Sequence, residues 1–144
     1  MKASRRAGPT SARSSGRSEL SYSGAWPNYF VYFDLAVTEY LRAIDFTYPE
    51  GFTALGSDMF AVHAEASFVA SARYDDTIDI GARVSRLGRT SYAFVLGLFR
   101  GDALLVHGSV VYVNASLADR RPTPIPDVLL DKVIAFERVP PTRA

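Results

Sequence analysis

A single change of hydrophobic period divides this chain and limits the folds that it can adopt. Between residues 28 and 44, apolar residues recur at spacings of three and four, which is the period of an α-helix. They are Phe30, Phe33, Val37, Tyr40, Leu41 and Ile44. From residue 58 onward the period becomes two, which is typical of strands that cover a core with one face. The sequence therefore predicts one helix followed by a run of strands.

The predicted helix begins after Trp26-Pro27. Asn28 is the expected N-cap, because its side-chain oxygen can accept from the free backbone N–H groups of a first turn. The helix is expected to end near Ile44 or Asp45. Three further residues extend its apolar surface nearly all round: Val31, Leu35 and Ala36. A helix that is apolar on most sides is usually buried, so we expect a sheet to wrap it.

Four long strands are predicted, joined by short turns. Residues 58–70 alternate, with mostly apolar side chains at even positions, and residues 77–87 alternate in the same way. Residues 91–99 are apolar on both faces, residues 103–114 form the last long strand, and residues 127–132 are expected to make a helical turn. The order predicts an α+β fold in which an antiparallel sheet is wrapped around one long central helix. One face of such a sheet is poorly covered, so we expect it to pair with a second sheet or subunit.

Composition removes several classes of function. The chain has 144 residues, which fits one domain, and no cysteine, which excludes a disulfide scaffold, a zinc–thiolate site and a thiol nucleophile. Its two histidines, His63 and His107, stand without a third ligand at motif spacing, so no metal site is predicted. No apolar run approaches the ~20 residues that a spanning helix needs, so we predict no membrane partner.

Charge is spread unevenly. Residues 1–18 hold five basic residues and no acid, and the rest of the chain carries 11 basic and 15 acidic residues, a net charge of −4. This balance gives no reason to expect a nucleic-acid partner. We expect residues 1–18 to be a disordered or atypical Arg/Ser-rich tail, with a transit peptide as the alternative, residues 19–136 to be the folded domain and residues 137–144 to be a flexible tail. The absence of an apolar signal segment predicts a cytoplasmic protein.

Five short stretches follow one another in an order that is known from one family. They read AWPNY at 25–29, FDLAVTEYLR at 33–42, ASFVASARYDD at 66–76, RLGRTS at 86–91 and PTPIP at 122–126. Together they resemble the 4-hydroxybenzoyl-CoA thioesterase-like acyl-CoA thioesterases, which have the hotdog fold. The likeness covers about residues 25–131. It implies a homodimer or homotetramer that hydrolyses an acyl- or aryl-CoA and needs no cofactor.

The resemblance also implies where the reaction takes place. The family's catalytic carboxylate stands in a D-x-D-x-x-G segment before the helix; this chain lacks that segment, and an ungapped match places Glu19 at the carboxylate position. A carboxylate can attack a thioester or deprotonate water, and free N–H groups at a helix start can hold the developing oxyanion. The N–H groups would come from about residues 24–29, which include Asn28 and Tyr29. Asp34 is a further candidate, because a related hotdog branch takes its carboxylate from the helix.

Substrate-binding residues follow from the same resemblance. Basic residues at the family's R-x-G-R turn meet the phosphates of coenzyme A, which points to Arg86 and Arg89, and Ser91 would line the pantetheine groove. Trp26 and Phe68 are expected in the acyl pocket. The alternative function is a non-catalytic hotdog protein that binds an acyl thioester or acts as an assembly partner. A hotdog dehydratase is less favoured, since no histidine lies near the helix start.

Overall fold

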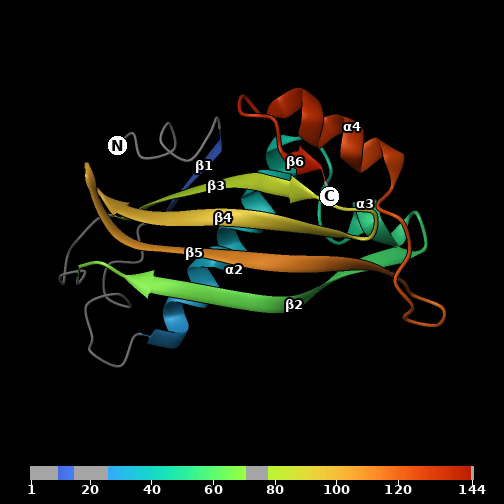
Figure 1. The fold of residues 1–144 in the computed structure, drawn as a ribbon, viewed down its shortest axis with the longest axis horizontal. Coiled ribbons are helices and arrows are strands. Elements are labelled where there is room, and N and C mark those ends of the chain that lie inside the picture. Colours follow the sequence, from blue (N-terminus) through green and yellow to red (C-terminus); the bar gives the residue numbers. More distant parts are fainter. Residues whose placement is uncertain (1–9, 15–25, 71–77, 144) are drawn as a thin grey trace.

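The computed structural model describes residues 10–14, 26–70 and 78–143. From the long helix onward, the main elements follow the predicted order of one helix and then a series of strands, whereas the short strand before the helix and the short helix after it were not predicted (Figure 1). They are β1 (Thr10–Ser14), α2 (Trp26–Ala43), α3 (Glu50–Thr53), β2 (Ser57–Phe68), β3 (Ile78–Leu87), β4 (Ser91–Arg100), β5 (Ala103–Ser116), α4 (Asp127–Phe136) and β6 (Thr142–Arg143).

The sheet has the strand order β1-β3-β4-β5-β2, and all of these neighbours are antiparallel. The short strand β6 runs parallel to β3. The long strands cross one side of α2, and α4 lies beside the β3 edge of the sheet (Figure 1). This arrangement confirms the predicted α+β fold with an antiparallel sheet around one central helix. None of the helices in the described ranges is long and apolar enough to cross a membrane.

The core forms where α2 packs on the sheet. The buried side chains of α2 recur with the helical period: Tyr32, Phe33, Ala36, Val37, Tyr40, Leu41 and Ile44. Phe33 packs so closely on Gly108 of β5 that a Cβ atom at this glycine would lie 2.7 Å from the phenyl ring. Tyr40 meets Phe94 of β4 edge to face, with ring centroids 5.1 Å apart. Helix and sheet therefore share one continuous apolar interior.

The structure corrects two expectations about α2. The helix begins at Trp26, so Asn28 lies inside its first turn and is not the N-cap. The expected burial on nearly all sides is wrong within one chain, because the sheet covers only one side of the helix. Phe30, Val31 and Leu35 are 41%, 64% and 40% exposed. We call these three residues the open face of α2.

The predicted alternation of the first long strand is also wrong over its first half. A bulge between Ala61 and His63 shifts the register of β2 against β5. Before the bulge an odd position, Met59, is buried, and after it an even position, Phe68, packs on the core. Val62 is 59% exposed although its even position predicted burial. A bulge inserts one extra residue, so it reverses which face the following side chains occupy.

The outer edge of β3 is closed by the N-terminal strand β1 together with C-terminal residues. Strand β1 pairs with Ile78–Ala82 of β3, and β6 pairs with Arg86 and Leu87. Between these two pairings, the buried carboxylate of Glu137 accepts hydrogen bonds from the Val84 N–H at 2.8 Å and from the Tyr40 hydroxyl at 2.5 Å. The predicted helical turn is longer than expected and forms α4. The domain boundaries predicted at residues 18 and 136 stay predictions.

Candidate active site

The first turn of α2 offers backbone N–H groups that have no acceptor within the helix. Trp26, Asn28 and Tyr29 lie in this turn. The first turn holds no acidic side chain that would neutralise its positive end. This end of the helix can therefore stabilise a negative oxygen. Glu19, the predicted carboxylate, lies outside the described residues.

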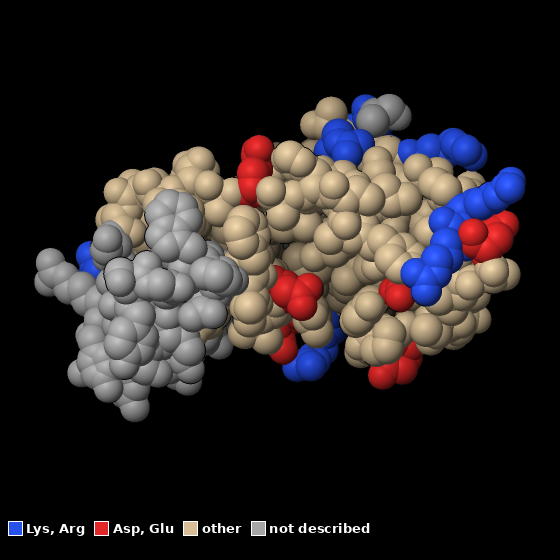
Figure 2. Space-filling view, turned by 90° about the horizontal axis from the view of Figure 1, so that it is seen from below, with Lys and Arg blue, Asp and Glu red and all other residues tan. Residues whose placement is uncertain are grey.

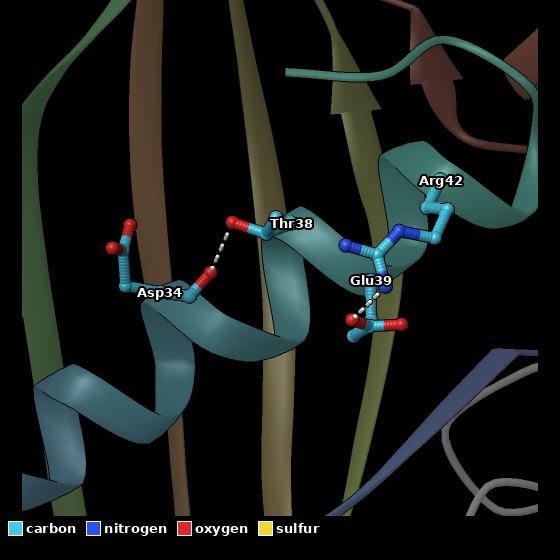
Figure 3. Close-up of polar contacts among 4 residues, drawn as sticks. All are labelled: Asp34, Thr38, Glu39 and Arg42. Atoms are coloured by element: carbon cyan, nitrogen blue, oxygen red, sulfur yellow. Dashed lines mark hydrogen bonds and ion pairs between the residues drawn. The ribbon is translucent and has the colours of Figure 1, made fainter. Parts of the chain in front are cut away.

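Asp34 provides a carboxylate on α2 itself. Its side chain is exposed, and its backbone carbonyl accepts a hydrogen bond from the Thr38 hydroxyl at 3.0 Å. The other acid of this helix, Glu39, is bonded to Arg42 at 2.7 Å. Figure 3 shows that the Asp34 and Glu39 side chains leave the helix in different directions. No ion pair within the described part of the chain involves Asp34, whereas Glu39 is already engaged.

Two tyrosine side chains lie within electrostatic range of Asp34. Burial, and then the negative charge of Asp34, raise the pKa of Tyr112 on β5. Burial, followed by Asp58 and by Asp34, raises the pKa of Tyr48, which follows α2. Both phenols therefore keep their protons at neutral pH. The Tyr48 hydroxyl is hydrogen-bonded to Asp58, so Tyr112 is the phenol that can donate a hydrogen bond to a negative group near Asp34. Sequence reasoning missed both residues, because they come from separate elements and only the fold brings them near α2.

The turn between β3 and β4 carries the predicted phosphate-binding residues. The Arg86 guanidinium donates to the Ser91 hydroxyl at 3.4 Å, and the Gly88 N–H donates to the Ser91 carbonyl at 2.7 Å. Gly88 is tightly enclosed, since a Cβ atom there would lie 3.1 Å from the Arg86 guanidinium. Arg89 is exposed, and the ion pairs among the described residues do not include it. The turn thus presents guanidinium groups whose geometry suits phosphate oxygens.

Phe68 lies at the other end of the molecule from this turn. It is the last residue of β2, it is half-buried, and it packs against the core. This end of β2 and the start of α2 lie at the same end of the fold (Figure 1). The structure therefore brings Phe68 to the end at which Trp26 begins the helix. Two residues expected in one acyl pocket thus share one region of the fold.

The two halves of the predicted site lie at opposite ends of one chain. Helix α2 has 18 residues, and it spans about 27 Å at 1.5 Å per residue. Its first turn lies at one end of the sheet, and the Arg86–Ser91 turn lies at the other (Figure 1). Seen from the β2 side, most of the surface near the middle of the view is uncharged, and several Lys and Arg gather with acids at its right-hand end (Figure 2). One copy therefore does not bring the two halves together.

A cavity of about 470 Å³ lies at the Arg-turn end. Among its lining residues are Ser57 at the start of β2, Asn114 near the end of β5 and Thr123 in the proline-rich segment that follows. Asn114 is 1% exposed. Sequence analysis did not single it out for the site, because an asparagine in a strand carries no signal of its own. No group of three or more His, Asp or Glu within the described ranges is arranged to hold a metal ion.

Comparisons with known proteins agree with this architecture. The family described as "Thioesterase superfamily" matches residues 27–107. The crystal structure of the PA5185 protein from Pseudomonas aeruginosa is similar, at 25% identity and a TM-score of 0.79, over 94% of this chain and 96% of that one. The Staphylococcus aureus protein SAV2348, solved in complex with CoA, is 14% identical, with a TM-score of 0.80 over 92% of this chain and 85% of that one.

A third similar structure is that of Slr0204, a 1,4-dihydroxy-2-naphthoyl-CoA thioesterase from Synechocystis. It is 13% identical, with a TM-score of 0.75 over 85% of this chain and 93% of that one. No curated protein matches this chain. The family match and the similar structures confirm the expected hotdog fold and the resemblance that suggested it.

Proposed function

Because the chain belongs to the thioesterase superfamily, we propose that it is an acyl-CoA thioesterase, which converts an acyl- or aryl-CoA and water into the free acid and CoA. The observation that carries the proposal is the start of α2. The sheet packs against this helix, and the backbone N–H groups of the helix's first turn have no acceptors within the helix. Such a group of donors suits the carbonyl of a thioester, whose oxygen becomes negative during hydrolysis.

The proposed reaction needs one carboxylate. As the water oxygen attacks the carbonyl carbon, the carboxylate takes a proton from the water, and the N–H groups of the first turn of α2 hold the resulting oxyanion. The tetrahedral intermediate then collapses, the carbon–sulfur bond breaks, and the departing thiolate takes up the proton. The products are a carboxylic acid and the thiol of CoA.

Two acids are candidates for this carboxylate. Glu19 is favoured by its place before the helix, where the family carries its catalytic acid. Asp34 is favoured by its exposure and by the phenols of Tyr48 and Tyr112 within range of its charge. A phenol that keeps its proton could orient the water or the acyl group by donating a hydrogen bond. Substitution of each acid separates the two candidates.

The remaining substrate contacts follow the same proposal. Arg86 and Arg89 bind the phosphates of CoA, and Ser91 lines the path of the pantetheine. Trp26 and Phe68 form part of the acyl pocket, where their rings accept either aryl or aliphatic groups. The similar Staphylococcus aureus protein was solved with CoA, and the Synechocystis protein is named for an aryl-CoA substrate; both support an acyl-CoA as the ligand here.

We further propose that the protein is a homo-oligomer, because the site is incomplete in one copy. The start of α2 and the Arg86–Ser91 turn lie at opposite ends of the chain, so a second copy in the reversed direction would place its turn beside the first copy's helix start. The open face of α2 and the outer edge of β2 are the surfaces available for such a copy. Strand β2 pairs only with β5 among the described strands.

The edge of β2 is complementary to itself in hydrogen bonding. The side chains of His63 and Glu65 are 60% and 68% exposed on the same face of the strand. If two copies of β2 pair antiparallel about Ala64, His63 of each copy lies opposite Glu65 of the other. An imidazole N–H can donate a hydrogen bond to a carboxylate, and such a cross-strand pair favours pairing. A second copy therefore fits this edge better than an unrelated strand would.

A direct assay tests the proposed activity. The protein is incubated with aryl- and fatty-acyl-CoAs, and the released thiol is measured with a thiol reagent. We expect turnover of at least one substrate, and a loss of at least about 100-fold in kcat for either Glu19→Gln or Asp34→Asn, the size expected for a general base. Glu39→Gln is the matched control, because Glu39 lies on the same helix and pairs with Arg42.

Absence of turnover across the panel would overturn the enzyme proposal. The alternative, a hotdog protein that binds an acyl thioester without hydrolysing it, predicts binding of acyl-CoA with no released thiol. Calorimetry with a non-hydrolysable acyl-CoA analogue distinguishes these results.

A further inference from the structure

The turn that carries Arg86 and Arg89 is held from outside its own hairpin. The carbonyl of Arg89 accepts a hydrogen bond from the Ile125 N–H at 2.9 Å, and the carbonyl of Thr90 accepts one from the Asn114 N–H at 2.8 Å. Both central residues of the turn are thus bonded to the C-terminal part of the chain. Ile125, which is 3% exposed, anchors the first of these contacts in the core. The position of the turn therefore depends on the position of the segment around Ile125.

That segment has few bonds of its own. Prolines at positions 122, 124 and 126 have no backbone N–H and cannot extend a strand ladder. The cavity of about 470 Å³ lies against it, so packing on that side is incomplete. Hydrogen bonds must therefore supply much of what holds the segment in place.

The side chain of Asn114 supplies those bonds. Its Nδ2 donates to the Thr123 hydroxyl at 3.0 Å, to the Pro124 carbonyl at 3.0 Å and to the Thr123 carbonyl at 3.4 Å. Its backbone carbonyl accepts from the Thr123 N–H at 2.9 Å. One buried residue thus ties β5, the β3–β4 turn and the proline-rich segment together.

We propose that Asn114 is the positioning residue of the CoA-binding turn: through Thr123, Pro124 and Ile125 it sets the place of the Arg89 backbone, and with it the guanidinium groups that meet the phosphates of CoA. The proposal rests on the proposed function, since it assigns a role within CoA recognition. It predicts that replacing Asn114 weakens binding of the nucleotide end of the substrate and leaves the rate of the reaction at the start of α2 unchanged.

The test compares two substrates that differ only in the nucleotide. An acyl-CoA carries the phosphates, and the corresponding acyl-pantetheine does not. For Asn114→Ala we expect KM for the acyl-CoA to rise about tenfold, which corresponds to about 1.4 kcal/mol. We expect kcat to stay within about twofold, and both constants for the acyl-pantetheine to stay within about twofold. Equal losses on both substrates would overturn the proposal, because a general structural defect does not distinguish them.

Two further variants keep the test decisive if Asn114→Ala folds poorly. Thr123→Val removes one acceptor and leaves both carbonyl acceptors, so we expect a smaller rise in KM of about threefold, confined to the acyl-CoA. Ser57→Ala is the matched control, because this buried hydroxyl lines the same cavity and has no hydrogen-bond partner among the described residues. An effect of Ser57→Ala equal to that of Thr123→Val would contradict the role of Asn114.

Arg89→Gln links the effect to the turn. If Asn114 acts through the turn, the losses from Asn114→Ala and Arg89→Gln on acyl-CoA are less than additive in the double variant. Additive losses would contradict the proposal. If the wild-type protein binds CoA but hydrolyses nothing, the proposed function fails alone, and the same comparison is made on the Kd values of CoA and pantetheine. If it does not bind CoA, both proposals fail.

Discussion

The two long edges of the sheet are finished in different ways. At the β3 edge, β1, β6 and the buried carboxylate of Glu137 bond to the β3 backbone. The Phe136 ring of α4 lies edge to face against Tyr40 of α2, with centroids 5.4 Å apart. At the β2 edge, no described strand continues the sheet, and the open face of α2 stands next to it with Val31 64% exposed. An edge that is closed within the chain serves stability, whereas an edge left open and apolar is suited to a partner. The proposed oligomer requires this difference: the β3 edge is completed within the chain, and the β2 edge remains available for a second copy.

The largest effect is expected at the closed edge. Glu137→Ala leaves the Tyr40 hydroxyl and the Val84 N–H buried without their acceptor, at a cost of about 2–4 kcal/mol in the free energy of unfolding. Denaturant unfolding measures this loss. Asp131→Ala, on the exposed side of α4, is the control and should change stability by less than about 0.5 kcal/mol. Similar values for the two variants would mean that Glu137 does not hold the edge.

The contact between helix and sheet should tolerate little added volume. In Gly108→Ala the new methyl group meets the Glu65 carbonyl and the Phe33 ring, and the backbone oxygen cannot move aside without disturbing β2. We expect a loss of about 1–3 kcal/mol in thermal or denaturant unfolding. Ser109→Ala, at the next position of β5, should be nearly neutral. A neutral Gly108→Ala would show that α2 sits less closely on β5 than described.

At the open edge the effect should fall on assembly. Val31→Asp places a charge on a side chain that is already exposed in one copy, so the stability of the single chain should change by less than about 0.5 kcal/mol. If a second copy covers this face, the oligomer should weaken at least tenfold, or about 1.4 kcal/mol. Light scattering across a dilution series measures the change. Asp45→Asn, beyond the other end of α2, is the control, because asparagine also tolerates the left-handed backbone of this position. An unchanged assembly in Val31→Asp would remove this face from the interface.

The smallest effect concerns pH. Burial raises the pKa of Glu137 above its ordinary value of 4.5, against the opposing effects of the Tyr40 and Val84 hydrogen bonds and of Arg83. The folded protein therefore holds this proton more tightly than the unfolded chain, and stability falls as pH rises from 4.5 through the folded pKa. Glu137→Gln should flatten this part of the stability profile. A profile of equal slope in both proteins would contradict the raised pKa.

Periodicity predicted the large elements well, because the core is built from regularly spaced side chains. Phe33, Val37 and Tyr40 follow the helical period and are buried as expected. The bulge near Val62 was not predictable, since a single inserted residue leaves no mark on composition. The exposure of Val31 was not predicted for a different reason. An apolar pattern indicates that a helix face is buried, but not whether the same chain or a partner buries it.

The site was harder to predict than the fold. Arg86, Arg89 and Ser91 lie on one turn as their motif implied, because neighbours in sequence stay neighbours in a hairpin. Tyr112 and Asn114 lie on β5, far along the chain from α2, Tyr48 and the Arg86–Ser91 turn. Only tertiary packing brings these three residues to the sites in which we propose that they act. Glu19 lies outside the described residues, and its role stays a prediction.

The central claim is that each active site joins the start of α2 in one copy to the Arg86–Ser91 turn of another. One measurement tests it directly. A variant carrying Glu19→Gln and Asp34→Asn and a variant carrying Arg86→Gln and Arg89→Gln are co-expressed in equal amounts, and acyl-CoA hydrolysis is measured at low substrate concentration. In a random population of dimers, about half contain one copy of each variant. Each of these mixed dimers has one intact site and one site that lacks both halves, so we predict recovery of about a quarter of wild-type activity. Activity no greater than the average of the two separate variants would contradict the claim.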